Sequence, residues 1–317
     1  MFAYILRRLA YAIPIVLSVA LLCFLLVHMT PGDPLVAVLP ADASQELAQQ
    51  LRQAYGFDKP LPVQFGLWLW RVLHGDLGAS IATGRPVAAE VARAVANTVT
   101  LAFAAALIGF TLGLALGLIA GYFRDTWVDK VATSIAIAGV SVPHYWLGMV
   151  LVIIFSVELN WLPAVGAGDG GSGQWAWDWA HIRYLILPAI TTSVIPMGII
   201  TRNVRALTGD ILSQDFVEAL YAKGMRQAQV FRHVIRNAAP TALAVMGLQL
   251  GYMLGGSILI ETVFSWPGSG LLLNSAIFQR DLPLLQGTIL VLAIFFVALN
   301  LMVDVAQALI DPRIRRT

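Results

Sequence analysis

Residues Asp215–Gly224, with the sequence D-F-V-E-A-L-Y-A-K-G, form a short polar segment between two long apolar runs. The pattern predicts a capped helix, because Asp215 can accept a hydrogen bond from the first turn and Glu218 can return one to the N–H of the cap. Gly224 suits the left-handed position that ends a helix. Small residues and apolar anchors recur at helical spacing, namely Ala219, Ala222, Phe216, Leu220 and Tyr221. The segment is either a docking element for a groove on another protein or an ordinary interfacial connector between membrane helices.

The composition of the whole chain indicates an integral membrane protein. Apolar residues make up 58% and charged residues 12% of the 317 positions, whereas soluble domains have roughly 45–50% and about 25%. The net charge of +2 gives no indication of nucleic-acid binding. Cys23 is the single cysteine, so no disulfide can form within the chain.

Six apolar runs are long enough, at ~1.5 Å per residue, to cross a hydrocarbon core of ~30 Å. The predicted spans are residues 9–28, 98–120, 131–157, 184–200, 238–263 and 284–309. The fold class is therefore all-α, a polytopic membrane protein with one transmembrane domain over residues 1–317. Pro143 predicts a kink near Ser141 in the third span. The first span has a basic start but no A-x-A cleavage site, so we expect it to be retained.

Glycines at a spacing of four predict close packing of two spans. Such glycines share one face of a helix and let a neighbouring backbone approach closely. They are Gly109, Gly113, Gly117 and Gly121 in the second span, and Gly247, Gly251 and Gly255 in the fifth. A role in permeation is the alternative for this face.

The distribution of basic residues predicts the topology. With both termini inside, the inner segments hold thirteen Lys and Arg residues, and the two short outer loops hold only Arg183 and Arg280. Residues 202–236 are then a cytoplasmic loop, and residues 30–97 are an extracytoplasmic helical segment. The basic strip of the cytoplasmic loop is explained at least in part by topology alone.

Catalytic motifs are missing from the sequence. It contains no H-E-x-x-H and no G-x-S-x-G, and none of Lys59, Lys130 and Lys223 follows a glycine as a phosphate-binding loop requires. We therefore expect no catalytic residue, metal or cofactor, and any ATPase must be another polypeptide. A secondary transporter or channel would need ionisable residues along its pathway, and the spans offer little beyond Asp304 near the inner face.

Several motifs in order along the chain carry a family resemblance. They are L-R-R-L, H-M-T-P-G-D-P, H-G-D-L-G-A-S, S-V-P-H-Y-W-L-G, E-A-L-Y-A-K-G followed by H-V-I-R-N-A-A-P, E-T-V-F-S-W-P-G-S-G and D-P-R-I-R. Together they resemble the first (B-type) permease subunit of bacterial dipeptide, oligopeptide and nickel ABC importers. Leu220 departs from the usual second alanine of the E-A-A pattern, and Ala238-Ala239-Pro240 replaces its hydrophobic-x-Leu-Pro tail.

The resemblance implies a type I ABC importer permease-like bundle in the bacterial inner membrane. It also implies a second related permease as heterodimer partner, two cytoplasmic ATPase subunits and an extracytoplasmic substrate-binding protein. Residues 202–236 become the coupling loop, with ATPase-coupling residues Asp215, Glu218, Ala219, Leu220, Ala222 and Gly224.

The substrate implied by the resemblance is a peptide, while nickel chelates, glutathione and opine-like solutes stay open. Polar residues within the spans can line a translocation pathway or bond between helices. They are Thr191, Thr192, Gln249, Tyr252 and Ser257. We favour bonding between helices for most of them.

Overall fold

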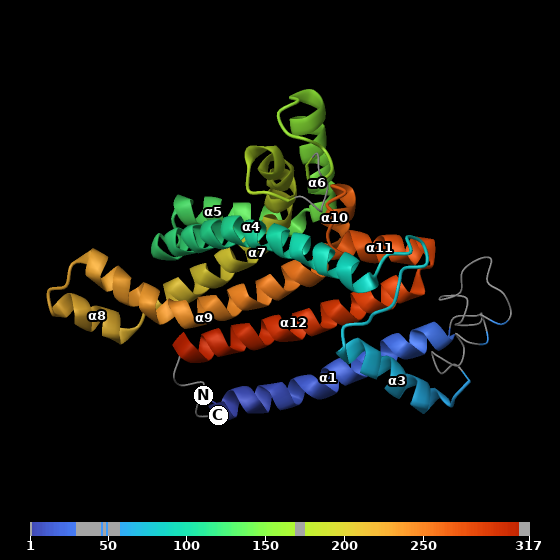
Figure 1. Cartoon of the computed structure of the whole chain (residues 1–317). Coiled ribbons are helices and arrows are strands. Elements are labelled where there is room, and N and C mark those ends of the chain that lie inside the picture. Colours follow the sequence, from blue (N-terminus) through green and yellow to red (C-terminus); the bar gives the residue numbers. More distant parts are fainter. Residues whose placement is uncertain (1, 30–45, 47–48, 50–57, 169–174, 311–317) are drawn as a thin grey trace. The chain divides into compact units, whose positions relative to one another are not determined.

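The computed structural model describes residues 2–29, 46, 49, 58–168 and 175–310 (Figure 1). These residues form helices and connecting turns, with one isolated bridge between Ala79 and Pro86. The helices are α1 Phe2–Met29, α3 Leu61–Leu73, α4 Val87–Tyr122, α5 Trp127–Ser141, α6 His144–Val152, the π-helix Ile153–Glu158, α7 Trp179–Leu212, α8 Asp215–Ala222, α9 Gln227–Gly256, α10 Ile258–Val263, α11 Ser269–Gln279 and α12 Leu282–Ile310. Within the described residues, five helices are long and apolar enough to cross a membrane, or six if α5 and the bent segment after it form one span.

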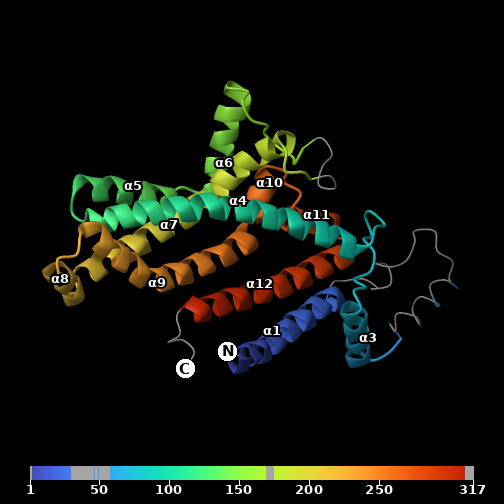
Figure 2. The ribbon, with the colours of Figure 1, turned by 60° about the vertical axis from the view of Figure 1, so that its left-hand side comes forward.

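The chain divides into two compact units. The first unit contains Val99–Trp266 and the chain from Leu299 onward, and the second contains Phe2–Thr98 and Pro267–Ala298. In the first unit, α4, α5 and α7 run side by side, and α8 lies at the far end of α7 and α9 (Figures 1 and 2).

The glycine face of α4 packs directly on α7. A Cβ added at Gly109 would lie 2.8 Å from the carbonyl oxygen of Ser193, and one at Gly117 would lie 2.8 Å from that of Thr201. Gly113 and Gly121 are equally close to α7. The Thr201 hydroxyl also reaches the carbonyl oxygen of Gly113, at 3.4 Å. Packing is thus confirmed for the second predicted span, since no side chain fits between these backbones.

The glycines of α9 behave differently from those of α4. A Cβ at Gly247 would collide with Val303 of α12, as expected for a packing glycine. At Gly255 an added Cβ would meet nothing within 4 Å, so the prediction that this residue lets a neighbour approach is wrong.

The third predicted span is two segments rather than one kinked helix. α5 ends at Ser141, Val142 is extended before Pro143, and the following α6 and π-helix turn away by 95°. A residue before proline is driven out of the helical region, and Pro143 then starts α6 as its N-cap. A change of direction this large exposes backbone groups that a simple kink would have kept paired.

Both helices next to the docking segment are longer than predicted. α7 continues through Leu212 and α9 begins at Gln227, so most of the expected loop 202–236 is helical. The apolar period continues past the hydrophobic run, with Val204, Ile211 and Val230 buried and Asp210 exposed. At its other end, α9 stops at Gly256, and α10 is a separate helix inside the predicted fifth span.

In the second unit, one buried carboxylate organises the loop before α4. Asp281 accepts hydrogen bonds from the Ser80 hydroxyl at 2.5 Å and the Ala82 N–H at 3.2 Å, and it also accepts one from the Leu284 N–H in the first turn of α12. α3 packs beside α1 through His28, whose Nε2 lies 3.0 Å from the Gln64 side-chain oxygen. The predicted extracytoplasmic segment 30–97 lies largely outside the described residues before position 58.

We predict that Gly117→Leu destabilises the protein by about 1–3 kcal/mol, the usual cost of forcing extra side-chain atoms into a packed core. Gly255→Leu is the matched control, because its side chain would enter open space. Thermal unfolding and folded yield of the two purified variants in detergent measure the difference. Equal stability of both variants would show that the close contact between α4 and α7 is not required for the fold.

Candidate functional site

The candidate docking helix α8 starts one residue earlier than the capping prediction requires. Gln214, in extended conformation, is the N-cap and makes no side-chain capping bond, while its carbonyl oxygen accepts from the Val217 N–H at 2.9 Å. Asp215 is therefore the first helical residue, and the predicted capping box of Asp215 and Glu218 is wrong. Both carboxylates still lie in the first turn, where they interact favourably with the helix dipole.

The C-terminal end of α8 follows the prediction. Gly224 has φ +77°, its N–H donates to the carbonyl oxygen of Tyr221 at 2.9 Å, and the Met225 N–H donates to that of Leu220 at 3.2 Å. These two bonds form a Schellman motif, which reverses the chain into α9.

One face of α8 is buried against its own helical hairpin. Val217 belongs to a buried cluster with Ile211 of α7 and Val230 of α9, and Phe216 and Leu220 pack against that cluster. Phe216 and Leu220 thus help to fix α8 to its own hairpin, and only their remaining exposed surface is available to a partner. Tyr221 is 44% exposed and remains available.

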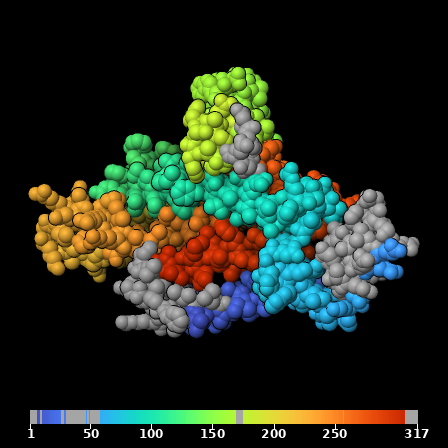
Figure 3. All heavy atoms as spheres, viewed as in Figure 1, coloured from blue at the N-terminus to red at the C-terminus, as the bar shows by residue number. Residues whose placement is uncertain are grey.

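The opposite face of α8 is exposed and narrow. It presents two carboxylates, two small side chains and one tyrosine, namely Asp215, Glu218, Ala219, Ala222 and Tyr221. On the side shown in Figure 3, the α8–α9 end projects from its unit without cover from other described parts of that unit. A thin, acidic helix face held rigidly from behind fits a groove on a partner protein.

An ion pair with a buried carboxylate holds α7 ten residues before α8 begins, and the sequence analysis missed it. The Arg205 guanidinium binds Asp129 of α5 with two bonds, Nε to Oδ1 at 2.5 Å and Nη2 to Oδ2 at 2.6 Å. Asp129 also accepts from the Asp125 N–H at 3.0 Å and the Thr133 hydroxyl at 3.1 Å. In the sequence, Arg205 is one of the basic residues of the loop 202–236. Asp129 just before the third predicted span was the available signal, because an acidic residue at the edge of a span needs a partner.

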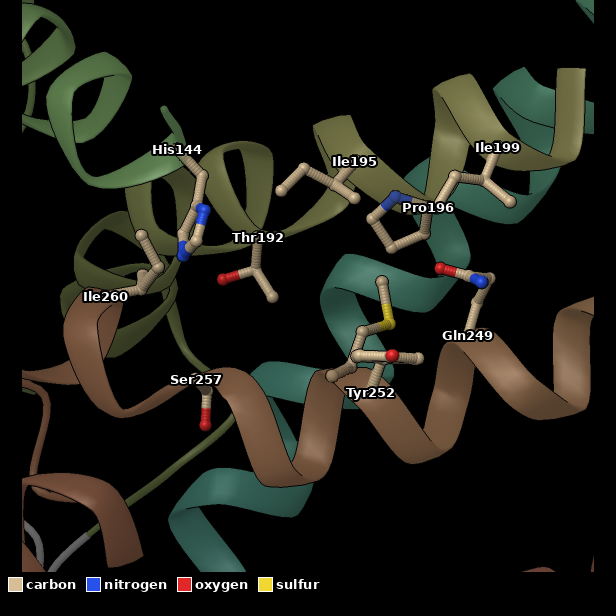
Figure 4. A pocket seen from close by; sticks show the side chains of 10 residues that line it. His144, Thr192, Ile195, Pro196, Ile199, Gln249, Tyr252, Ser257 and Ile260 are labelled. Carbon is tan, nitrogen blue, oxygen red and sulfur yellow. The ribbon is translucent and has the colours of Figure 1, made fainter. Parts of the chain in front are cut away.

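A second feature of the first unit is a cavity of about 360 Å³ between α6, α7, α9 and α10 (Figure 4). Its lining residues are His144, Thr192, Ile195, Pro196, Ile199, Gln249, Tyr252, Met253, Ser257 and Ile260. Four of the five candidate pathway residues are thus brought together. His144 was not predicted to line the pathway. The sequence analysis used the motif S-V-P-H-Y-W-L-G, which contains it, only as evidence for the family resemblance.

Thr191, the fifth candidate, is not among the lining residues of this cavity. It is fully buried, and its hydroxyl donates to the carbonyl oxygen of Leu187 in its own helix at 2.8 Å. Ser257 donates to Glu261 of α10 at 2.8 Å. The hydrogen bonds of Thr191 and Ser257 are therefore local, each to a residue four positions away. For these two residues the structure does not show the bonding between neighbouring spans that the sequence analysis favoured.

Two family models match the chain over most of its length. Residues 113–316 match the family described as "Binding-protein-dependent transport system inner membrane component", and residues 1–102 match its N-terminal counterpart. The chain belongs to this family. As an inner membrane component of this kind, it is a multi-pass transport protein, which confirms the resemblance found in the sequence motifs.

Two relatives of this inner membrane component align over nearly its whole length. A peptide transport system permease protein of Brucella abortus (strain 2308) is 40% identical over 316 residues, covering 99% of both chains. The glutathione transport system permease protein GsiC of Salmonella choleraesuis (strain SC-B67) is 39% identical with the same coverage. A chain of the MetNI methionine ABC transporter in inward-facing conformations shares the fold, with a TM-score of 0.58 at 16% identity over 70% of this chain and 96% of that one. The predicted all-α, ABC importer permease-like fold class is therefore confirmed.

We predict that Arg205→Ala destabilises this membrane component by about 3–5 kcal/mol, because it leaves the Asp129 carboxylate buried without its cation. Exchange of both residues, Asp129→Arg with Arg205→Asp, restores part of the loss. Arg202→Ala, at an exposed position on the same helix, is the control and changes stability by less than about 0.5 kcal/mol. Thermal unfolding in detergent measures the stability of all three variants. An Arg205→Ala protein as stable as the control would show that the Asp129–Arg205 ion pair does not stabilise the fold.

Proposed function

We propose that the chain is the membrane-spanning subunit of an ATP-driven peptide importer and forms half of its translocation pathway. Its relatives are named for peptide and glutathione transport. Glutathione is itself a tripeptide, so both names agree on short peptides as cargo. Import of glutathione, nickel chelates or opine-like solutes by the same architecture is the alternative.

The observation that carries the coupling role is the two-sided construction of α8. Its buried face joins the cluster of α7 and α9, and its exposed face is acidic and small. A force on this helix from a cytoplasmic ATPase is passed to two long membrane helices without deforming the helix. Asp215, Glu218, Ala219 and Ala222 meet the ATPase in this proposal, while Leu220 and Gly224 set the position and end of the helix.

The proposed complex contains a second related permease, two cytoplasmic ATPase subunits and an extracytoplasmic substrate-binding protein. Both termini lie in the cytoplasm of the bacterial cell, because the Lys and Arg residues gather in the segments that this topology places inside. Residues 30–97 then lie outside, and α8 faces the cytoplasm. ATP is bound and hydrolysed by the partner subunits, since the sequence lacks a phosphate-binding loop.

We predict that Ala219→Trp prevents stable association with the ATPase subunits, because an exposed bulky ring cannot enter a groove shaped for a small side chain. Ala219→Ser keeps the surface thin and serves as the control. Co-purification of ATPase subunits and peptide transport in proteoliposomes should both fall at least tenfold for the tryptophan variant only. Full, coupled transport by Ala219→Trp would show that α8 is merely a connector.

Glu218→Ala separates docking from helix stability. Since Glu218 makes no capping bond to Gln214, its removal costs only the dipole interaction, ~0.3–1 kcal/mol. We expect unchanged folded yield and a loss of ATPase activity coupled to transport in the reconstituted complex. Gly224→Val, which strains a left-handed position by ~1 kcal/mol or more, gives the contrasting case in which α8 itself is misplaced. Normal coupling in Glu218→Ala would exclude this carboxylate from the ATPase contact.

A further inference from the structure

Three interruptions of helical structure meet at the cavity of Figure 4. His144 follows the break between α5 and α6, Ser257 lies between α9 and α10, and Pro196 lies within α7. Pro196 has no N–H to donate to the carbonyl oxygen of Thr192, four residues earlier. At membrane depth, interrupted backbone is tolerated where it is buried in protein or lines a water-filled space. The convergence of three such places on one cavity favours a hydrated site there.

The surface of the cavity is mainly apolar, and its lining contains five polar side chains but no carboxylate, lysine or arginine. Half of the ten lining residues are apolar, and the other half are His144, Thr192, Gln249, Tyr252 and Ser257. These five offer hydroxyl, amide and imidazole groups, which donate and accept hydrogen bonds to neutral partners. These side chains supply no opposite charge for the terminal ammonium and carboxylate of a peptide, but they can exchange hydrogen bonds with the N–H and C=O groups of its main chain.

Two of the lining residues carry hydroxyl groups with hydrogen-bonding capacity to spare. The Thr192 Oγ1 is buried and makes no hydrogen bond within the described part of the chain, and Figure 4 shows it turned to the same side as the His144 ring. Ser257 donates its proton to Glu261, which is fully buried behind it, so the Ser257 oxygen keeps its acceptor capacity. A buried hydroxyl left unpaired is costly, which makes Thr192 a ready contact for an arriving group.

We propose that this cavity is a binding site for the main chain of a peptide in transit, held by Thr192, Gln249 and His144 through neutral hydrogen bonds. The site rests on the peptide-importer function proposed above and specifies what part of the cargo it recognises. Its volume is at the lower end of the ~300–1,000 Å³ typical of small-molecule pockets, so it holds a short stretch of peptide. Recognition of main-chain groups without fixed charges accepts many side chains.

The test measures protection of one cysteine inside the cavity. In a Cys23→Ala background, Ile195→Cys places a thiol on the apolar part of the lining. The full complex, with partner permease and ATPase subunits in lipid nanodiscs and without ATP, is treated with iodoacetamide in the presence of increasing trialanine. Trisarcosine is the matched probe, because it is an isomer of trialanine with the same charged ends but no main-chain amide N–H.

We expect Ile195→Cys to react with iodoacetamide and trialanine to protect it, with trisarcosine needing at least a fivefold higher concentration. One net hydrogen bond of ~1 kcal/mol corresponds to this factor. Thr192→Val and Gln249→Leu, each added to Ile195→Cys, should raise the half-protecting concentration of trialanine by a similar factor. Lys130→Cys, exposed at the start of α5, should react equally with and without either peptide.

Three results would overturn the proposal. Labelling that trialanine does not slow would mean a water passage without a binding site. Equal protection by both peptides would mean occupancy without recognition of amide groups. Failure of iodoacetamide to react would mean a closed or lipid-filled cavity. The assay uses neither ATP nor transport, so its failure is distinct from a failure of the docking role of α8, which is measured by association with the ATPase subunits.

Discussion

The direct contact between the backbones of α4 and α7 determines the position of everything described in the first unit. Four glycines remove the side chains that would separate these helices, and carbonyl oxygens of α7 occupy the space. In a membrane, where apolar helices gain little by leaving lipid, such contact supplies the packing energy that holds a bundle together. α7 then carries α8 at its cytoplasmic end in the proposed topology, and Thr192 and Pro196 farther along the same helix.

The Asp129–Arg205 pair extends this rigid body to α5. On α7, Arg205 lies within the stretch that contacts the glycines of α4, since Gly121 meets the Arg205 carbonyl oxygen and Thr208, and Asp129 is almost fully buried. A buried pair of this kind is a specific constraint, because removing one partner leaves an uncompensated charge. In the coupling role proposed above, motion delivered to α8 reaches α7 and α9 through their shared cluster, and it reaches α4 and α5 through their contacts with α7. The cavity borders α6, α7, α9 and α10, so a relative displacement of these helices would change its lining.

Relatives named for peptide and for glutathione transport are similar to this chain at nearly the same level. A mainly apolar cavity with a few neutral polar side chains suits a subunit that passes cargo chosen elsewhere. Selectivity in this view belongs to the external binding protein, and the membrane subunit recognises what short peptides have in common.

Local composition was enough to determine the apolar runs, the glycine ladder of α4 and the left-handed Gly224, because each depends on the residue itself and its near neighbours in sequence. Tertiary structure decided the rest. Thr191 and Thr192 are adjacent in sequence, yet they point about 100° apart on the helix, and only packing shows which one meets the cavity. Likewise, Phe216 and Leu220 have the spacing of partner anchors, but part of each side chain packs against the hairpin of α7 and α9. The 95° turn after Ser141 and the pairing of Arg205 with Asp129, 76 positions away, depend on contacts that no local pattern encodes.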